Sequence, residues 1–361
     1  MAIDIENTKK LGFGLMRLPK TGPIINVEKT KAMVDLFMEA GFTYFDTAFV
    51  YPGSESAARK ALVERYPRES FTLATKLNAL VAPTEKIARK QFETSLERTG
   101  AGYFDYYLLH AIMQKNRDKY ENLHLWEFVN EQKEKGIIKN VGFSFHDSPE
   151  LLEEVLNAHP EVDFVQLQIN YADWDDPKVA SRANYEVARK FGKPVVIMEP
   201  VKGGNLANPP GKVKELFDAA NPDASYASWA IRFAASLDGV LTVLSGMSNV
   251  EQMQDNLSFM KDFKPLSLEE QHIITQARQI IAGSDTIPCT ACSYCTEGCP
   301  QKIKIPDIFK AMNSDDSDAY VKVVSEGGKA SDCIACGQCE EACPQHIQII
   351  ESLKKAAVKF E

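Results

Sequence analysis

The sequence has no long apolar run, no recognisable leader and no excess of positive charge. No stretch of about 18 apolar residues occurs, so a membrane-spanning helix is not expected. The first residues, MAIDIENTKKLG, lack the apolar core of a signal peptide. The net charge of −9 argues against a general affinity for nucleic acid or for anionic membranes. These absences predict a cytoplasmic protein that binds neither nucleic acid nor a membrane.

Cysteine is absent from the first 288 residues, and all eight cysteines follow in two copies of the spacing C-x2-C-x2-C-x3-C-P. The copies are Cys289, Cys292, Cys295, Cys299 and Pro300, and Cys333, Cys336, Cys339, Cys343 and Pro344. This run is typical of ferredoxins with two [4Fe–4S] clusters, in which the fourth cysteine of each run ligates the other cluster. That rule predicts one cluster on Cys289, Cys292, Cys295 and Cys343, and a second on Cys333, Cys336, Cys339 and Cys299.

Two other interpretations of the cysteines fit the pattern less well. A zinc site usually needs paired C-x2-C units, often with histidine, and it closes at four ligands. A disulfide framework is typical of small secreted chains, whereas this chain is long and begins with a cysteine-free region.

The onset of the cysteines also predicts a domain boundary, near the small and polar stretch Ala282-Gly283-Ser284-Asp285. We expect a large domain over residues 1–282 and a small, mainly α-helical, two-cluster ferredoxin-like domain over residues 283–361. Within the small domain, residues 305–312 are a predicted helix with Pro306 near its first turn, and residues 319–325 are a second candidate.

Short apolar runs alternate with longer amphipathic segments in the large domain. The predicted strands are residues 42–48, 71–77, 103–110, 141–145, 164–171, 194–200 and 240–246, and helix-like segments include residues 28–40, 84–99 and 178–191. Seven strands, with an eighth expected nearby, favour an α/β fold of the (β/α)8 TIM barrel type. A doubly wound open sheet is the alternative, although no G-x-G-x-x-G follows the first strands, where Gly12-Phe13-Gly14 is an incomplete match.

Polar side chains close several of the predicted strands. They are Asp46, Lys76, His110, Ser144, Gln166 and Asn170. In a (β/α)8 barrel the carboxyl ends of the strands meet at one face, which carries the active site. Any one of these residues could instead cap a helix or form a turn.

The segments Asp46-Thr47-Ala48, Tyr51, Thr75-Lys76 and Leu108-Leu109-His110 together resemble the aldo-keto reductase family, from Gly12 to about Phe259. The resemblance implies an NAD(P)H-dependent reduction of an aldehyde or ketone, or the reverse oxidation of an alcohol. It also implies that Asp46, Tyr51, Lys76 and His110 form the catalytic tetrad.

The chemistry of the reaction explains these residue types. Hydride addition leaves negative charge on the carbonyl oxygen, which needs a proton donor and an electrostatic partner. Tyrosine has an ordinary pKa near 10, so we expect the Lys76 ammonium, held by Asp46, to lower the pKa of Tyr51. His110 would donate a hydrogen bond that positions the carbonyl.

The resemblance implies a nicotinamide cofactor as well. Ser144 and Gln166 match the positions that hold the carboxamide, with His146 a further candidate there, and Met198 stands where a tyrosine commonly stacks on the nicotinamide. The pyrophosphate and adenosine positions are Ser245, Gly246, Ser248, Gln252 and Asn256, at a predicted helix start that suits phosphate. NADP-specific members carry a Lys-Ser pair and an arginine where this chain has Gly246, Met247 and Gln252. NADH, or the use of both cofactors, is therefore favoured, unless Arg232 or Lys202 substitutes.

The reactions expected of the two parts of the chain differ in the number of electrons transferred, because a hydride carries two electrons and each cluster carries one. The combination resembles the iron–sulfur-containing subgroup of the aldo-keto reductases. Three functions stay open: a carbonyl reductase with structural or regulatory clusters, an electron-transfer oxidoreductase that links ferredoxin or flavodoxin to the barrel, and a redox sensor whose barrel binds nucleotide. The second function would suit a flavin, which the sequence does not indicate. The substrate is expected to be a small molecule, whose identity the loops do not reveal.

Overall fold

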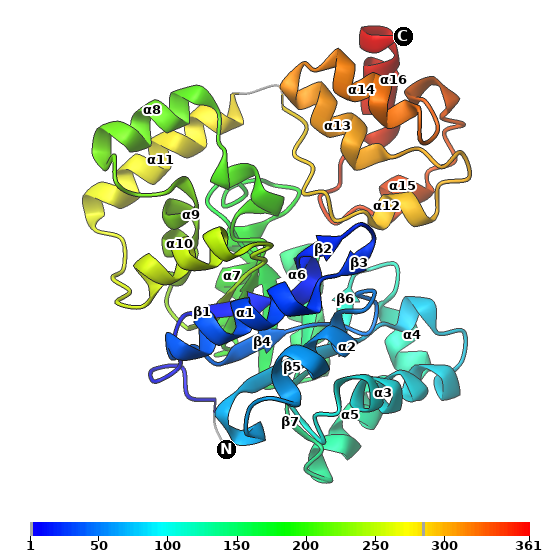
Figure 1. The fold of residues 1–361 in the computed structure, drawn as a ribbon. Coiled ribbons are helices and arrows are strands. Elements are labelled where there is room, and N and C mark those ends of the chain that lie inside the picture. The colour runs from blue at the N-terminus through cyan, green and yellow to red at the C-terminus, as the bar shows by residue number, and fades with distance from the viewer. Residues whose placement is uncertain (1–2, 284–285) are drawn as a thin grey trace.

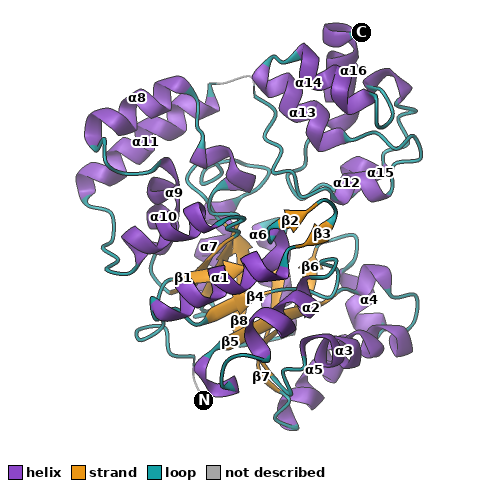
Figure 2. Ribbon diagram, in the orientation of Figure 1, coloured by secondary structure: helices purple, strands orange, loops and turns teal. Residues whose placement is uncertain are grey.

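The chain folds into a barrel and a smaller helical domain that lies over one end of it (Figure 1). A computed structural model describes residues 3–283 and 286–361. The barrel carries the strands of the large domain, whereas the C-terminal domain consists of helices and loops (Figure 2). The large domain's last helix ends at Ala282, the predicted boundary, while Ser284 and Asp285 lie outside the described residues.

Eight parallel strands close the barrel within the described part of the chain. They are β1 Leu11–Gly14, β4 Tyr44–Asp46, β5 Thr72–Leu77, β6 Phe104–Ile112, β7 Ile138–Phe145, β8 Phe164–Gln168, β9 Val195–Met198 and β10 Val240–Ser245. Because β1 pairs with both β4 and β10, the sheet has no free edge. The open doubly wound alternative is therefore wrong, and the eighth strand is β1, which contains the incomplete glycine motif. A hairpin of β2 (Lys20–Thr21) and β3 (Ile24–Ile25) follows β1.

Helices surround the barrel and build most of the C-terminal domain. They are α1 Val27–Glu39, α2 Ser54–Ala58, α3 Glu85–Thr99, α4 Arg117–Asn122, α5 Leu125–Glu134, α6 Pro149–Ala158, α7 Ser181–Lys190, α8 Gly211–Ala220, α9 Tyr226–Ala235, α10 Val250–Met260, α11 Leu268–Ala282, α12 Tyr294–Glu297, α13 Ile305–Ser314, α14 Ser317–Val324, α15 Gln338–Glu341 and α16 Ile349–Phe360. Side chains cap several of them: Asn26, Thr84, Ser148, Ser225 and Asn249 each accept an N–H bond from a first turn. The predicted helices in both domains are present.

Alternation along the strands separates the inside of the barrel from its outside. The interior cluster is Tyr44, Ala74, Tyr106, Leu108, Phe164, Val196, Leu241 and Leu244, with Ile3 and Ile5 packed against it. Neighbouring residues such as Phe45 and Leu73 point outward into the larger core beneath the helices. Gly142 is required inside, because a Cβ there would lie 2.6 Å from the ring of Phe164.

The C-terminal domain has a core of its own. Aliphatic and aromatic residues of α13, α14 and α16, among them Ile308, Phe309, Tyr320 and Leu353, pack together with Cys295 and Cys339. Among the described residues, no helix is both long enough and apolar enough to cross a membrane.

Candidate active site

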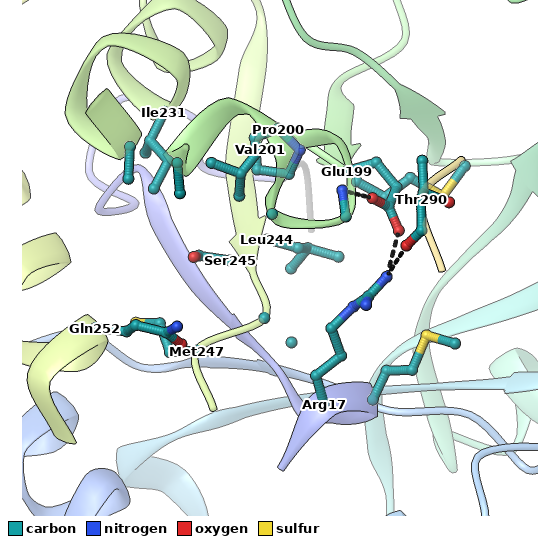
Figure 3. A pocket seen from close by; sticks show the side chains of 18 of the residues that line it. Arg17, Glu199, Pro200, Val201, Ile231, Leu244, Ser245, Met247, Gln252 and Thr290 are labelled. Carbon is teal, nitrogen blue, oxygen red and sulfur yellow. Dashed lines mark hydrogen bonds and ion pairs between the residues drawn. The ribbon is translucent and has the colours of Figure 1, made fainter. Parts of the chain in front are cut away.

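A cavity of about 750 Å³ lies at the carboxyl ends of the barrel strands. Its wall combines strand ends, the loop after β9, the first turns of α9 and α10, and two segments of the C-terminal domain. In Figure 3 the side chain of Arg17 reaches across toward Glu199 and Thr290. Its Nη2 atom donates to Glu199 Oε1 at 3.3 Å and to the backbone oxygen of Thr290 at 2.8 Å. Both domains therefore build this cavity.

The structure brings the four predicted catalytic residues together at one side of the cavity. Asp46, Tyr51 and His110 line it, and Lys76 lies behind them with no exposed surface. The Nζ atom of Lys76 is 2.5 Å from Asp46 Oδ1 and 2.8 Å from the backbone oxygen of Thr47. The same Nζ lies 5.3 Å from the centroid of the Tyr51 ring, and the His110 ring meets that ring edge-on at 5.8 Å between centroids.

Strand alternation explains why three of these side chains converge. Asp46, Lys76 and His110 each stand two residues after an interior side chain and therefore point to the same side of their strands. Those interior residues are Tyr44, Ala74 and Leu108. Tyr51 instead comes from the turn between β4 and α2, where its N–H donates to the backbone oxygen of Ala48 at 3.0 Å.

Burial shifts the pKa values of the ionisable residues around Tyr51. It lowers the pKa of His110 well below 6.5, with the nearby charges of Lys76 and His146 adding to the effect, so His110 is neutral at pH 7. His110 Nδ1 has no hydrogen-bond partner among the described residues. Burial also raises the pKa of Asp46 and lowers that of Lys76, and their ion pair opposes both shifts.

The protonation of Tyr51 differs from the expectation. We expected Lys76 to lower the pKa of Tyr51, but the pKa is raised well above 10. Removal of the hydroxyl from bulk water is the main cause, and the neighbouring Tyr294, Asp46 and Glu199 raise the pKa further. Tyr294 belongs to the C-terminal domain and lines the same cavity as Tyr51. Tyr51 is therefore protonated at neutral pH in this arrangement.

The predicted nicotinamide residues divide into two groups. Gln166, Met198 and His146 line the cavity, and the Gln166 amide nitrogen donates to the Met198 sulfur at 3.4 Å. The amide oxygen of Gln166 has no partner in the described part of the chain, which fits the NH₂ group of a carboxamide. Ser144 is not part of the lining, because its hydroxyl accepts the N–H of Ala111 at 2.7 Å.

All the predicted residues of the pyrophosphate and adenosine end line the same cavity. They are Ser245, Gly246, Ser248, Gln252 and Asn256. Asn256 Nδ2 donates to Ser245 Oγ at 2.6 Å, and Gln252 Oε1 accepts the N–H of Ser248 at 2.7 Å. These contacts join the end of β10 to the first turns of α10, whose N-terminus suits a phosphate group.

Acidic side chains outnumber basic ones at the predicted pyrophosphate and adenosine end of the cavity. Glu251 and Asp255 line the cavity, and among the lysines and arginines of the described residues only Arg17 does so. Both proposed substitutes for a phosphate-binding arginine are engaged elsewhere. Arg232 pairs with the two oxygens of Glu270 at 2.7 and 3.0 Å, and Lys202 pairs with Asp173.

Several polar cavity residues were not assigned to this site from the sequence, among them Arg17, Glu199, Thr290, Cys292 and Tyr294. Glu199 could have been assigned to the site from the sequence, because it follows Met198 at the end of a predicted strand. The last three lie in the first cysteine run, where the spacing of the thiols dominates the pattern and gives no sign of contact with the barrel.

The eight cysteines line two small cavities of the C-terminal domain, four in each. One cavity is lined by Cys289, Cys292, Cys295 and Cys343, and the other by Cys299, Cys333, Cys336 and Cys339. Apolar side chains such as Ile305 border both. Four thiols around an apolar space fit a [4Fe–4S] cluster. Among the described residues, no three His, Cys, Asp or Glu side chains converge as the ligands of a single metal ion would.

Comparisons with known protein families give one match for the barrel and another for the C-terminal domain. Residues 10–279 match the aldo/keto reductase family, and residues 288–348 match a 4Fe-4S dicluster domain. An aldo-keto reductase of Mycobacterium avium is 26% identical over 264 residues, which cover 73% of this chain and 83% of that protein. Aldo-keto reductase str7 of Strobilurus tenacellus is 29% identical over 210 residues, and this chain spans 59% of its length.

Solved structures share the barrel. The holo form of an aldo-keto reductase from Bacillus halodurans superposes with a TM-score of 0.60 at 24% identity, over 74% of this chain and 91% of that one. An aldo/keto reductase from Klebsiella pneumoniae, solved with NADP and acetate, gives 0.60 at 18% identity over 77% and 93%. A closed parallel barrel with its cavity at the carboxyl ends of the strands is the arrangement of a (β/α)8-barrel enzyme. The family match covers most of the chain, and the protein belongs to the aldo/keto reductase family of oxidoreductases, with a 4Fe-4S dicluster domain at its C-terminal end.

Proposed function

We propose that the barrel catalyses the NAD(P)H-dependent reduction of a small aldehyde or ketone, or the reverse oxidation of an alcohol. The observation that carries this proposal is the grouping of Tyr51, His110 and the Asp46–Lys76 ion pair at one wall of the cavity. When bound, the nicotinamide would supply the hydride chemistry. Gln166 and Met198 would hold the nicotinamide end of the cofactor, and the residues from Ser245 to Asn256 its other end.

The residues of the chain supply the proton. Tyr51, whose pKa is raised, carries a proton that it can give to the carbonyl oxygen as negative charge develops there. The neutral His110 can offer an N–H to the same oxygen. As Tyr51 loses its proton, the positive Lys76 behind its ring stabilises the phenolate, and Asp46 holds Lys76 in position.

We further propose that NADH is preferred over NADPH. The 2′-phosphate of NADPH would meet Glu251 and Asp255 rather than a guanidinium, and Gln252 is already bonded to the backbone of Ser248. Arg17, the cavity-lining arginine, is bound to Glu199 and Thr290. These contacts support the preference that the sequence indicates.

An electron-transfer oxidoreductase is the second candidate function. The supporting observation is that Cys292, one of the proposed cluster ligands, lies on the wall of the barrel cavity. Ferredoxin or flavodoxin would then be the external partner. A cytoplasmic location stays a prediction.

Anaerobically purified protein should consume one NADH for each alcohol that it forms from a panel of aldehydes and ketones. NADPH should give a kcat/KM at least about ten-fold lower, because a charged hydrogen bond of about 1.5–3 kcal/mol to its phosphate is missing. NADH absorbance and alcohol yield are measured together, with a reaction lacking the carbonyl as control. Turnover that requires added ferredoxin or flavodoxin would favour the second candidate. NADH binding without turnover of any carbonyl would favour the sensor.

We also propose that the two cysteine cavities hold two [4Fe–4S] clusters with crossed ligation, as the spacing rule predicts. Each cavity gathers three thiols of one run and the fourth thiol of the other run. When bound, such clusters would supply one-electron chemistry. The cysteines themselves would tie the two ends of the domain together.

Paired substitutions test the crossed ligation. Cys289→Ala with Cys343→Ala removes two thiols from one cavity, so we expect about four of about eight irons to remain per chain. The matched pair, Cys289→Ala with Cys299→Ala, removes one thiol from each cavity and should lower the iron content much further. Iron and sulfide analysis of anaerobic protein measures both. The reverse order of iron contents would mean that each run holds its own cluster.

A further inference from the structure

Arg17 connects the two domains across the barrel cavity (Figure 3). It ends the short turn after β1, and its aliphatic stem lies against Gly246, where a Cβ would be 3.4 Å from the Arg17 Cδ atom. Its guanidinium donates to the backbone oxygen of the buried Thr290 at 2.8 Å. The side chain therefore runs from the predicted pyrophosphate end of the barrel cavity to the first cysteine run.

The contact with Thr290 places a positive charge beside one of the two cysteine cavities. We call this cavity the proximal cavity, because one of its cysteines, Cys292, also lines the barrel cavity. Thr290 lines the proximal cavity as well, between Cys289 and Cys292 in the chain. The distal cavity is lined by the other four cysteines, and none of these lines the barrel cavity: Cys299, Cys333, Cys336 and Cys339.

Glu199 supplies a fixed counter-charge to Arg17. The Arg17 Nη2 atom donates to Glu199 Oε1 at 3.3 Å, and the N–H of Gly203 donates to Glu199 Oε2 at 2.6 Å. Asn170 Nδ2 donates to the backbone oxygen of Glu199 at 3.2 Å, which supports its left-handed φ of 55°. The Arg17 and Glu199 side chains are only 28% and 20% exposed, so water screens their charges incompletely.

The reduction of a cluster responds to charges of this kind. One electron is added and no bond is formed, so a nearby cation stabilises the reduced state and a nearby anion destabilises it. A unit charge about 10 Å away changes such an equilibrium about ten-fold when the effective dielectric constant is about 20. A nucleotide bound along the residues from Ser245 to Asn256 would bring its pyrophosphate to the stem of Arg17, where the phosphates compete with Glu199 for the guanidinium.

We propose that Arg17 couples the nucleotide end of the barrel cavity to the reduction potential of a cluster in the proximal cavity. This inference rests on the proposed nucleotide and cluster sites. The guanidinium favours the reduced cluster while it is bonded to Thr290, and a bound pyrophosphate draws it away. Nucleotide binding then lowers the potential, and reduction of the cluster weakens nucleotide binding by the same factor. This coupling between one-electron and two-electron chemistry needs no electron transfer between the cluster and the nicotinamide.

Two substitutions with opposite effects on charge test the proposal. Arg17→Met keeps the stem and removes the cation, so the equilibrium constant for reduction of the proximal cluster should fall about ten-fold, which is a potential lower by about 59 mV. Glu199→Gln keeps the shape and removes the anion, so the same potential should rise. Arg17→Lys retains the charge and should return the potential close to its original value. The potential of the distal cluster should stay unchanged in all three variants. Dithionite titration of the full-length, cluster-loaded protein, followed by electron paramagnetic resonance, measures both potentials.

Arg65→Met is the matched control. Arg65 makes the same kinds of contact as Arg17: an ion pair with Asp35 at 2.8 Å and a hydrogen bond to the backbone oxygen of Ala61 at 3.0 Å. Its side chain is 30% exposed, and it lines neither the barrel cavity nor a cysteine cavity. Its removal should leave both potentials unchanged. If Arg17→Met loses its clusters, Arg17→Gln, which can still donate to Thr290, takes its place.

ADP-ribose tests the coupling itself, because it carries the adenosine and pyrophosphate of NAD⁺ and has no nicotinamide to be reduced. Saturating ADP-ribose should lower the potential of the proximal cluster, and the shift should be smaller in Arg17→Met. Calorimetry should give a dissociation constant for ADP-ribose that is higher in the reduced protein than in the oxidised protein, by the factor that the shift in potential gives.

Several results would overturn the inference. Equal shifts of both clusters, or shifts of the same sign in Arg17→Met and Glu199→Gln, would mean that altered packing and not charge is the cause. Unchanged potentials in Arg17→Met would mean that Arg17 only ties the domains together. A potential that bound ADP-ribose does not move would exclude the coupling. Failure of the proposed sites is distinguishable, since iron analysis would then find no clusters or calorimetry would find no binding of ADP-ribose.

Discussion

Tyr51→Phe should lower kcat for carbonyl reduction by about 10²- to 10⁴-fold, the usual contribution of a positioned proton donor. The phenyl ring preserves the contact with His110 and the position over Lys76, so only the proton and its hydrogen bond are lost. Steady-state kinetics with saturating NADH measure the change. The dissociation constant of NADH should stay near its original value, since no predicted cofactor contact is removed.

Tyr185→Phe is the matched control for this prediction. Tyr185 lies on α7, outside the cavity, and its hydroxyl donates to the backbone oxygen of Asp238 at 2.8 Å. Its removal should change kcat less than two-fold. If Tyr51→Phe retained full activity, Tyr51 could not be the proton donor, and His110 would become the group to test.

The raised pKa of Tyr51 adds a pH dependence with a definite sign. Because its folded-state pKa lies well above 10, Tyr51 stays protonated as the pH rises from 7 to 10, so kcat/KM for reduction should not fall over this range on its account. His110, whose pKa lies well below 6.5, likewise stays neutral as the pH drops to about 6. A fall in kcat/KM centred near pH 8 would contradict the raised pKa of Tyr51.

Local patterns were sufficient to predict seven of the eight barrel strands, all but β1, and the inward side chains at the ends of several of them. Alternation determines which residues point inside, and Asp46, Lys76 and His110 follow it directly. Ser144 shows where alternation is not enough. β6 shifts register after Leu109, and Ala111 has a φ of 58°, which turns its N–H toward the Ser144 hydroxyl. No periodicity in the sequence reports such a bulge.

Contacts between the domains could not be predicted in the same way. Tyr294 occupies a spacer position between two cysteines, and nothing in the cysteine spacing relates it to Tyr51. The sequence therefore suggested Lys76 as the main influence on the pKa of Tyr51, whereas burial and, after it, the neighbouring Tyr294 of the C-terminal domain raise that pKa. A pKa depends on the whole enclosure of a group, which includes residues distant in the chain.

Lys76→Met should lower the free energy of unfolding by about 3–5 kcal/mol, the usual cost of removing one partner of a buried ion pair. Lys76 has no exposed surface, and its partner Asp46 would be left as a buried carboxylate. Lys190→Met is the matched control. Its pair with Glu153 has a similar length, 2.6 Å, but Lys190 is exposed, so we expect a loss below about 1 kcal/mol. Tryptophan fluorescence during anaerobic urea unfolding reports the barrel, which contains all three tryptophans.

The loss of unfolding free energy in Lys76→Met should depend on pH, because the charge of Asp46 depends on pH. Burial already raises the pKa of Asp46, and without Lys76 nothing nearby opposes that shift. A group whose folded-state pKa is raised stabilises the fold at low pH, and this stabilisation is lost as the pH rises through the folded-state pKa. The deficit should therefore be smaller at pH 5 than at pH 8. Adding Asp46→Leu should restore much of the stability without restoring carbonyl reduction, because the buried charge is removed while Tyr51 still lacks its positive neighbour. A variant that regained both would show that the ion pair supports the fold alone.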